Sequence, residues 1–243
     1  VDGSDYLVAV VSDGAGSAAH SDQGSSIACQ AWRSFLTDHL ALGGAWPIER
    51  AQLEGWLADF QAKISKVAEE FGTTGRDYAC TLLVAVIGPS GATFLQVGDG
   101  AIVVAGRDMP GTYAPVFWPD QGEYANQTIF ATSPEAFARV QIEFMDEHIE
   151  EVALFSDGIQ NLVLNYRDQT AHARWFEDMF RGIRSLASAG YSDEMSAALD
   201  RFLSGQKVNE RTDDDKTLIL ASRRPPQLPA EHEQPRDETP HAP

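Results

Sequence analysis

Aspartate residues recur in this sequence at the points where apolar runs end. Asp13 closes the run "YLVAVVS" and Asp157 closes "EEVALFS", and each is followed by a glycine. Asp99 separates the two glycines of "VGDGA". Three further acidic residues precede the last apolar run, in "RTDDDKTLIL": Asp213, Asp214 and Asp215. Each group lies where a buried strand would pass into a tight turn.

Turn formation alone is one explanation of these groups, because aspartate and glycine both favour turns. Four such groups together favour a chemical explanation. Carboxylates that converge on one sheet edge repel each other unless a cation lies among them. Oxygen ligands suit hard ions such as Mg²⁺ or Mn²⁺, and glycine lets a backbone carbonyl approach the ion. Two such ions, about 3.5–4 Å apart, would bind a phosphate and activate a water molecule.

The elements around these aspartates are predicted to form antiparallel sheet covered by pairs of helices. Tyr6–Ser12 is an unbroken apolar run, which is typical of a strand buried on both faces. An amphipathic helix is expected after it, and a second one from Pro47 to Gly72. Between residues 78 and 157 short strands alternate with tight turns, which predicts an antiparallel meander. Two more helices and a last strand, "KTLILAS", complete an α+β fold.

Composition narrows the class of protein. With 243 residues, 43% of them hydrophobic, the chain can bury one sizeable core. A formal net charge of -18 argues against nucleic acid as a partner. No apolar run is long enough for a membrane span and no signal peptide opens the chain, so a cytoplasmic location is expected. Residues 1–222 are predicted to form the domain, and 223–243, rich in proline and charge, a disordered tail.

The ordered motifs resemble those of the metal-dependent protein serine/threonine phosphatases, the PPM or type 2C family, and of a bacterial branch within it. "VSDGAGS", "VGDGAIVV", "LFSDGI" and "DDKTLIL" occur in that family's order and approximate spacing. "YACTLLVAVI" is similar to its threonine-bearing core strand, and "GEYANQT", residues 122–128, to a bacterial stretch. Any single motif is weak, whereas the ordered set is specific. The resemblance implies a four-layer α-β-β-α sandwich with metal ions at one edge of two antiparallel sheets.

The resemblance also implies metal ligands. Asp13 would bridge two ions, Mn²⁺ or Mg²⁺, and the carbonyl of Gly14 would bind one of them. Asp157 and Asp214 would bind the other ion. Among the three consecutive aspartates, Asp214 matches because the family's ligand lies three residues before a threonine, here Thr217.

A third, weaker ion would be held by Asp99 together with Asp157. The implied activity is hydrolysis of phosphoserine and phosphothreonine on proteins by a metal-activated water, which would counteract a serine/threonine kinase. The catalytic set implied by the resemblance is Asp13, Asp157 and Asp214.

Two departures from the family pattern affect this assignment. Some members carry a histidine after the first Asp-Gly as the acid for the leaving group, and here that position is Ala15. His20 is close in sequence but is expected on the surface. The family normally begins with a strand whose arginine grips the phosphate, whereas only residues 1–5, none of them basic, precede the first strand. Either the sequence lacks the start of its domain, or this clamp has been lost.

Two other interpretations remain open at this point. "GAGSAA", residues 14–19, fits the loose dinucleotide-binding pattern, although Asp13 would then point a carboxylate at the pyrophosphate. Alternatively, the chain is a catalytically weak or dead phosphatase-like domain that binds phosphoproteins or regulates them. Mutually repelling carboxylates have no use in a dead site, which favours the enzyme.

Overall fold

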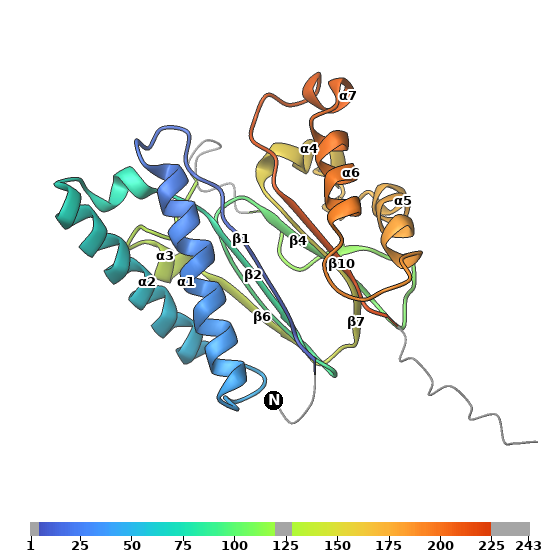
Figure 1. The fold of residues 1–243 in the computed structure, drawn as a ribbon, viewed down its shortest axis with the longest axis horizontal. Helices are drawn as coiled ribbons and strands as arrows, with labels where there is room; N and C mark the ends of the chain where they lie inside the picture. Colours follow the sequence, from blue (N-terminus) through green and yellow to red (C-terminus); the bar gives the residue numbers. More distant parts are fainter. Residues whose placement is uncertain (1–4, 120–127, 225–243) are drawn as a thin grey trace, which may run out of the picture.

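Two antiparallel sheets stack face to face in the computed structural model, which describes residues 5–119 and 128–224 (Figure 1). Helices cover the outer face of each sheet, so that the molecule has four layers. The predicted α-β-β-α sandwich is therefore confirmed. Among the helices in these two ranges, none combines the length and the apolar character that a membrane span requires.

The first sheet has the strand order β1-β2-β3-β6, and every neighbouring pair is antiparallel. Its strands are β1 (Leu7–Val11), β2 (Leu82–Ile87), β3 (Ala92–Val97) and β6 (Gln141–Met145). In the register of β1 with β2, Val11 pairs with Leu83. Every residue of β2 and β3 is buried, because a helix layer covers one face and the second sheet the other.

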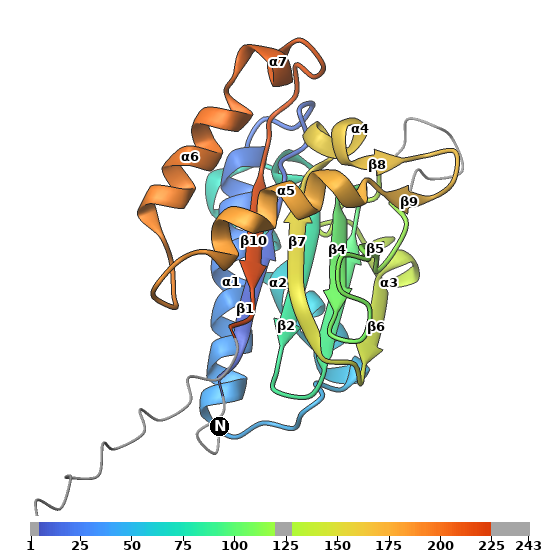
Figure 2. The same ribbon diagram turned by 90° about the vertical axis from the view of Figure 1, so that its right-hand side faces the viewer.

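The second sheet has the order β10-β7-β4-β5 and is also antiparallel (Figure 2). Its strands are β10 (Leu218–Ser222), β7 (Ile149–Phe155), β4 (Ala101–Gly106) and β5 (Ala114–Pro115). Phe155 at the end of β7 pairs with Leu218 at the start of β10. A small separate hairpin follows β7, formed by β8 (Leu164–Asn165) and β9 (Thr170–Ala171).

Two long helices cover the first sheet: α1 (Ser21–Ala41) and α2 (Arg50–Phe71). Gly72 ends α2 in the left-handed conformation, as predicted. The helix begins at Arg50 and not at Pro47, because Glu49 is still extended. Helices α5 (Ala173–Arg184) and α6 (Asp193–Leu203) lie on the second sheet (Figure 2). The short helices are η1 (Gly75–Tyr78), α3 (Ala136–Arg139), η2 (Asp157–Ile159), α4 (Gln160–Val163) and α7 (Gln206–Asn209).

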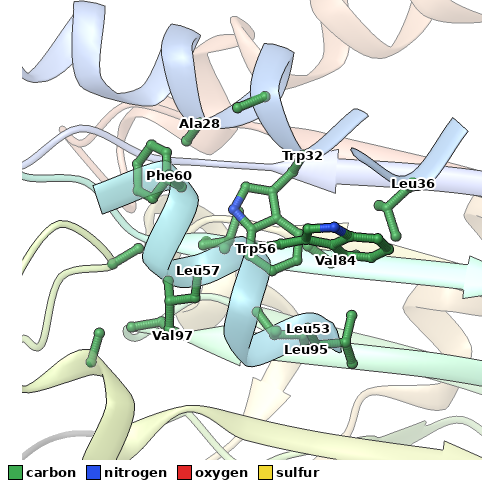
Figure 3. Packing of buried hydrophobic residues seen from close by; sticks show 14 of the residues in the cluster. Ala28, Trp32, Leu36, Leu53, Trp56, Leu57, Phe60, Val84, Leu95 and Val97 are labelled. Carbon is green, nitrogen blue, oxygen red and sulfur yellow. The ribbon is translucent and has the colours of Figure 1, made fainter. Parts of the chain in front are cut away.

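Three apolar cores hold the four layers together. Between α1, α2 and the first sheet, Trp32 and Trp56 meet edge to face amid aliphatic side chains such as Val84 (Figure 3). The second core fills the space between the sheets and includes Phe94 of β3. The third packs β4, β7 and β10 against α5, with Phe176 fully buried. These cores fix the relative position of the two sheets and thus of the strand ends described below.

One sequence prediction about strand pairing is wrong. The tight turn of residues 98–100 was expected to join two strands of one meander, but β3 and β4 lie in different sheets. The chain crosses between the layers at this turn, where Gly98 has a φ of +105° that side chains other than glycine rarely adopt. The turn with Asp99 therefore links the two sheets at their common edge.

Candidate metal centre

Four aspartates from separate segments line one cavity of about 170 Å³. It lies at the edge where β1, β3 and β7 end and where β10 begins. The antiparallel pairing of β7 with β10 puts the end of one strand beside the start of the other. The cavity is lined by Asp13, Gly14, Ala15, Gly16, Ser17, Thr81, Thr128, Phe130, Asp99, Asp157 and Asp214.

The first Ser-Asp-Gly segment is fastened to the neighbouring strand through Thr81. The hydroxyl of Ser12 donates to the Thr81 carbonyl at 2.6 Å. The Asp13 N–H donates to the Thr81 hydroxyl at 2.9 Å, and the Thr81 N–H donates to the Asp13 carbonyl at 2.8 Å. A Cβ on Gly14 would lie 2.7 Å from the Ser21 carbonyl oxygen. Glycine is needed there because the start of α1 passes so close.

The second Ser-Asp-Gly segment is built in the same way. The hydroxyl of Ser156 donates to the Asp215 carbonyl at 3.3 Å and accepts the Thr217 N–H at 3.1 Å. A Cβ on Gly158 would lie 2.0 Å from the Asp215 carbonyl oxygen. The repeated motif thus has a mechanical explanation: serine ties the strand end to its neighbour, and glycine lets another backbone approach. Both ties leave the aspartate side chain facing the cavity.

Burial, together with repulsion between the carboxylates, disfavours the ionised form of the aspartates in the cavity. Burial raises the pKa of Asp13 to about 7, and the carboxylates of Asp157 and Asp214 and a hydrogen bond with Asp157 add to this increase. The pKa of Asp157 is also raised, first by burial and then by the charges of Asp99 and Asp214. In the absence of a cation, a proton shared by the Asp13 and Asp157 carboxylates therefore reduces the negative charge of the cavity.

The donors fit a hard divalent cation. One carboxylate oxygen of Asp157, Oδ1, is buried and has no hydrogen-bond partner among the residues that the structure describes. Such a group is costly unless something binds it. The side chains that face the cavity offer oxygen and no sulfur or imidazole nitrogen. Over the part of the chain that the structure describes, however, no three His, Cys, Asp or Glu side chains yet form a cluster around one point. Ion binding would therefore require these carboxylates, which already face the cavity, to move closer together.

The predicted site residues are all placed on this cavity: Asp13, Gly14, Asp99, Asp157 and Asp214. Asp213 and Asp215 are not, and the Asp215 N–H donates to Asp214 Oδ1 at 2.9 Å. Ala15 lines the cavity, whereas His20 lies at the start of α1 and stacks on Tyr78. Most of the segment 122–128 lies outside the described residues.

Sequence reasoning missed several cavity residues. Thr128 was noted only within a motif, yet its hydroxyl donates to Asp99 Oδ2 at 2.5 Å. Phe130 carried no signal, since a single aromatic residue after a loop has no distinctive pattern. The dinucleotide interpretation of residues 14–19 is wrong, because the strand pairs of the two sheets are antiparallel and the fold is not a doubly wound parallel one.

Known proteins share both the sequence and the fold. The chain is 34% identical over 218 residues to serine/threonine-protein phosphatase 3 of Escherichia coli (strain K12), which covers 88% of this chain and 83% of that relative. The crystal structure of the serine/threonine phosphatase Stp1 from Staphylococcus aureus matches with a TM-score of 0.56 at 14% identity, over 91% of this chain and 85% of that one. PppA of Pseudomonas aeruginosa matches with a TM-score of 0.57 at 17% identity, over 90% and 89%. A family model described as protein phosphatase 2C matches residues 1–204, and the chain therefore belongs to the protein phosphatase 2C family.

Proposed function

We propose that this chain hydrolyses phosphoserine and phosphothreonine on protein substrates and needs two divalent cations, Mn²⁺ or Mg²⁺, to do so. The observation that carries the proposal is the shared cavity of four aspartates, in which one buried oxygen of Asp157 lacks a hydrogen-bond partner within the described ranges. The name of the E. coli relative, a serine/threonine-protein phosphatase, supports this substrate class. Proteins modified by a serine/threonine kinase would then be the substrates, and the two enzymes would oppose each other.

The residues of the cavity divide into ligands and wall. We assign Asp13 as the bridge between the two ions and the Gly14 carbonyl as a ligand of one of them. Asp157 and Asp214 would hold the other ion, and Asp99 with Asp157 a third, weaker one. When bound, such ions neutralise phosphate charge and lower the pKa of a water molecule. The catalytic set is thus Asp13, Asp157 and Asp214.

The chain itself contributes shape and rigid placement. Thr81 holds the Asp13 backbone through two hydrogen bonds, so the carboxylate enters the cavity from a fixed point. The wall of residues 14–17 consists of small side chains, which leave space for a phosphorylated side chain at the mouth. None of these four side chains is an acid, so the leaving serine or threonine oxygen would take its proton from water or from another group.

Hydrolysis of a phosphothreonine peptide, measured as released phosphate with and without Mn²⁺, tests this function. We expect activity that chelation abolishes and added Mn²⁺ restores. Asp157→Asn is the informative variant, because an amide keeps the size of the side chain but removes its charge. Activity that survives chelation, or an Asp157→Asn variant with unchanged metal dependence, would contradict the proposal.

A second candidate function is the binding of phosphoproteins without turnover. It is favoured by one observation: none of the described residues on the cavity is basic, so the wall itself offers the phosphate no cation. A phosphopeptide that binds in the presence of Mn²⁺ and is recovered still phosphorylated would establish this function in place of hydrolysis.

A further inference from the structure

Two buried glutamines hold the turn that carries Asp99. Gln96, at the end of β3, donates from Nε2 to the carbonyls of Gly98 at 3.5 Å and of Gly100 at 3.0 Å. Gln160 donates from its Nε2 to the carbonyl of Asp99 itself. Three consecutive carbonyls of this turn thus accept from side-chain amides. Because Gln96 is fully buried and Gln160 is only 4% exposed, neither side chain can swing out into solvent.

Gln160 joins two of the acidic segments to each other. It lies three residues after Asp157 in the chain, at the start of α4, while its amide reaches across to the turn of Asp99. This side chain is therefore a direct link between the two carboxylate-bearing segments. The pairing of β4 with β7 ends at Ala101 and Phe155, two residues short of each aspartate, and Gln160 continues the connection beyond this last pair.

Tyr166 fixes Gln160 in turn. The Tyr166 hydroxyl donates to Gln160 Oε1 at 2.5 Å, which orients the amide so that Nε2 faces the Asp99 carbonyl. The Tyr166 ring packs edge to face on Trp118, with ring centroids 5.3 Å apart. Burial, followed by the charges of Asp157 and Asp99, raises the pKa of Tyr166, so its hydroxyl stays protonated and able to donate.

We infer that Gln160 and Tyr166 are positioning residues that set the place of Asp99 against Asp157 and thereby the affinity for the weaker, third ion. This inference rests on the proposed function, since it concerns an ion of that same site. Neither side chain lines the cavity, so both act through the turn that they hold. The tight ions would be held by Asp13, Asp157 and Asp214, whereas the Gln160 amide bonds to the segment of Asp99, which serves only the weaker ion.

Calorimetric titration of the full chain with Mn²⁺ tests the inference without relying on activity. Gln160→Met keeps the length of the side chain but removes both hydrogen bonds, and Tyr166→Phe removes only the hydroxyl. Partners of this kind typically change metal affinity about ten- to a hundred-fold. The titration should show a tight phase, from the first two ions, and a weak phase, from the third. We expect Gln160→Met to lower the Mn²⁺ affinity of the weak phase by a factor in that range, and Tyr166→Phe to lower it less. The tight phase should change less than the weak phase in both variants.

Two control variants make the same chemical changes away from the cavity. Gln30→Met alters an exposed glutamine of α1, and Tyr191→Phe alters a tyrosine that is 82% exposed. Both should titrate like the unmodified chain. Asp99→Asn is the reference for a titration without the weak phase, because it removes the charge of a proposed ligand of the third ion. In a parallel assay, Gln160→Met should need more Mn²⁺ for half-maximal turnover while its turnover at saturating Mn²⁺ recovers.

Each outcome decides between the two ideas. If the unmodified chain binds no Mn²⁺, the proposed function fails and the inference falls with it. If the chain binds Mn²⁺ in two phases but Tyr166→Phe and Gln160→Met titrate like the controls, only the inference is overturned. It is also overturned if both phases weaken equally, because that result shows general loosening of the cavity. Should Gln160→Met not fold, Tyr166→Phe alone gives the answer.

Discussion

Thr81 and Asp13 hold each other by reciprocal hydrogen bonds: the Asp13 N–H donates to the Thr81 hydroxyl at 2.9 Å, and the Thr81 N–H donates to the Asp13 carbonyl at 2.8 Å. Asp13 follows an edge strand, β1, and needs this support because β1 pairs only with β2 among the described strands. Thr81 is 5% exposed, so a water molecule could not take over its hydrogen bond to the Asp13 N–H if the hydroxyl were removed.

Thr81→Val should therefore weaken both folding and metal binding. Valine keeps the shape but leaves the Asp13 N–H without its partner, which costs about 1–3 kcal/mol of folding free energy. Thermal unfolding and Mn²⁺ calorimetry measure the two effects. Thr81→Ser keeps the hydroxyl and should bind Mn²⁺ like the unmodified chain. Equal Mn²⁺ affinity in the valine variant would show that the side chain does not position Asp13.

Asp13→Asn should abolish turnover and sharply lower Mn²⁺ affinity, because a neutral amide replaces the charge that bridges two ions. Asp99→Asn should lower turnover but leave the tight ions bound. Calorimetry distinguishes the two variants, and normal Mn²⁺ binding by Asp13→Asn would refute the bridging role.

Without metal, the stability of the protein should fall as the pH rises. The folded state raises the pKa of Asp13 from 3.8 to about 7, so it binds the proton more tightly than the unfolded chain does. The contribution to stability is complete below about pH 4 and is lost as the pH rises through about 7. Thermal midpoints between pH 5 and pH 8, with chelator present, measure this loss.

Added Mn²⁺ should reverse that trend, because it binds the ionised carboxylates of the folded state. Asp13→Asn supplies the control, since its amide does not titrate and its midpoint should vary less with pH. A metal-free midpoint that rises from pH 5 to pH 8 would contradict the assigned pKa direction.

A matched pair of glycine substitutions tests whether Gly158 is needed for the close approach of the loop that carries Asp214. Gly158→Ala would place a Cβ 2.0 Å from the Asp215 carbonyl oxygen and should cost about 1–3 kcal/mol of stability. It should also weaken Mn²⁺ binding by displacing the loop of Asp214. Gly55→Ala, in the exposed part of α2 with no atom near the new Cβ, should add about 0.5–1 kcal/mol. Equal thermal midpoints for the two variants would show that the loop yields freely.

Arg223, the first residue of the predicted tail, makes hydrogen bonds to the folded part of the chain. The sequence alone predicts a disordered tail over residues 223–243, whose removal should leave the fold unchanged. Arg223, however, donates to the Gly88 carbonyl at 2.7 Å and to the Ile149 carbonyl at 3.0 Å, and so it joins the two sheets. We expect a chain that ends at Arg224 to unfold at the normal temperature.

A chain that ends at Ser222 loses these charge-assisted bonds, each worth about 1.5–3 kcal/mol, and should unfold at a lower temperature. Arg223→Met in the full chain is the matched substitution and should reproduce most of the loss. If all these chains share one thermal midpoint, Arg223 contributes nothing to the junction of the sheets.

The sequence by itself determined most of the elements and the family. The apolar runs before Asp13 and Asp157 predicted buried strands. The structure confirms a largely buried β7, whereas β1 is an edge strand that is only partly buried. The order of the Asp-Gly motifs indicated the family, because these short segments combine residue type, spacing and turn chemistry within a few positions. Such local features can be recognised in the sequence without knowing which residues are in contact in the fold.

Only the tertiary structure decided how distant segments meet. The turn at Asp99 looks like a hairpin in sequence but crosses between two sheets, since the register of β3 and β4 depends on partners far along the chain. Gln96 and Gln160 read as ordinary polar residues until packing buries them against one turn. A side chain that bonds to a distant backbone carbonyl produces no periodic pattern in the sequence. Its partner depends on the tertiary structure and not on the neighbouring residues in the chain.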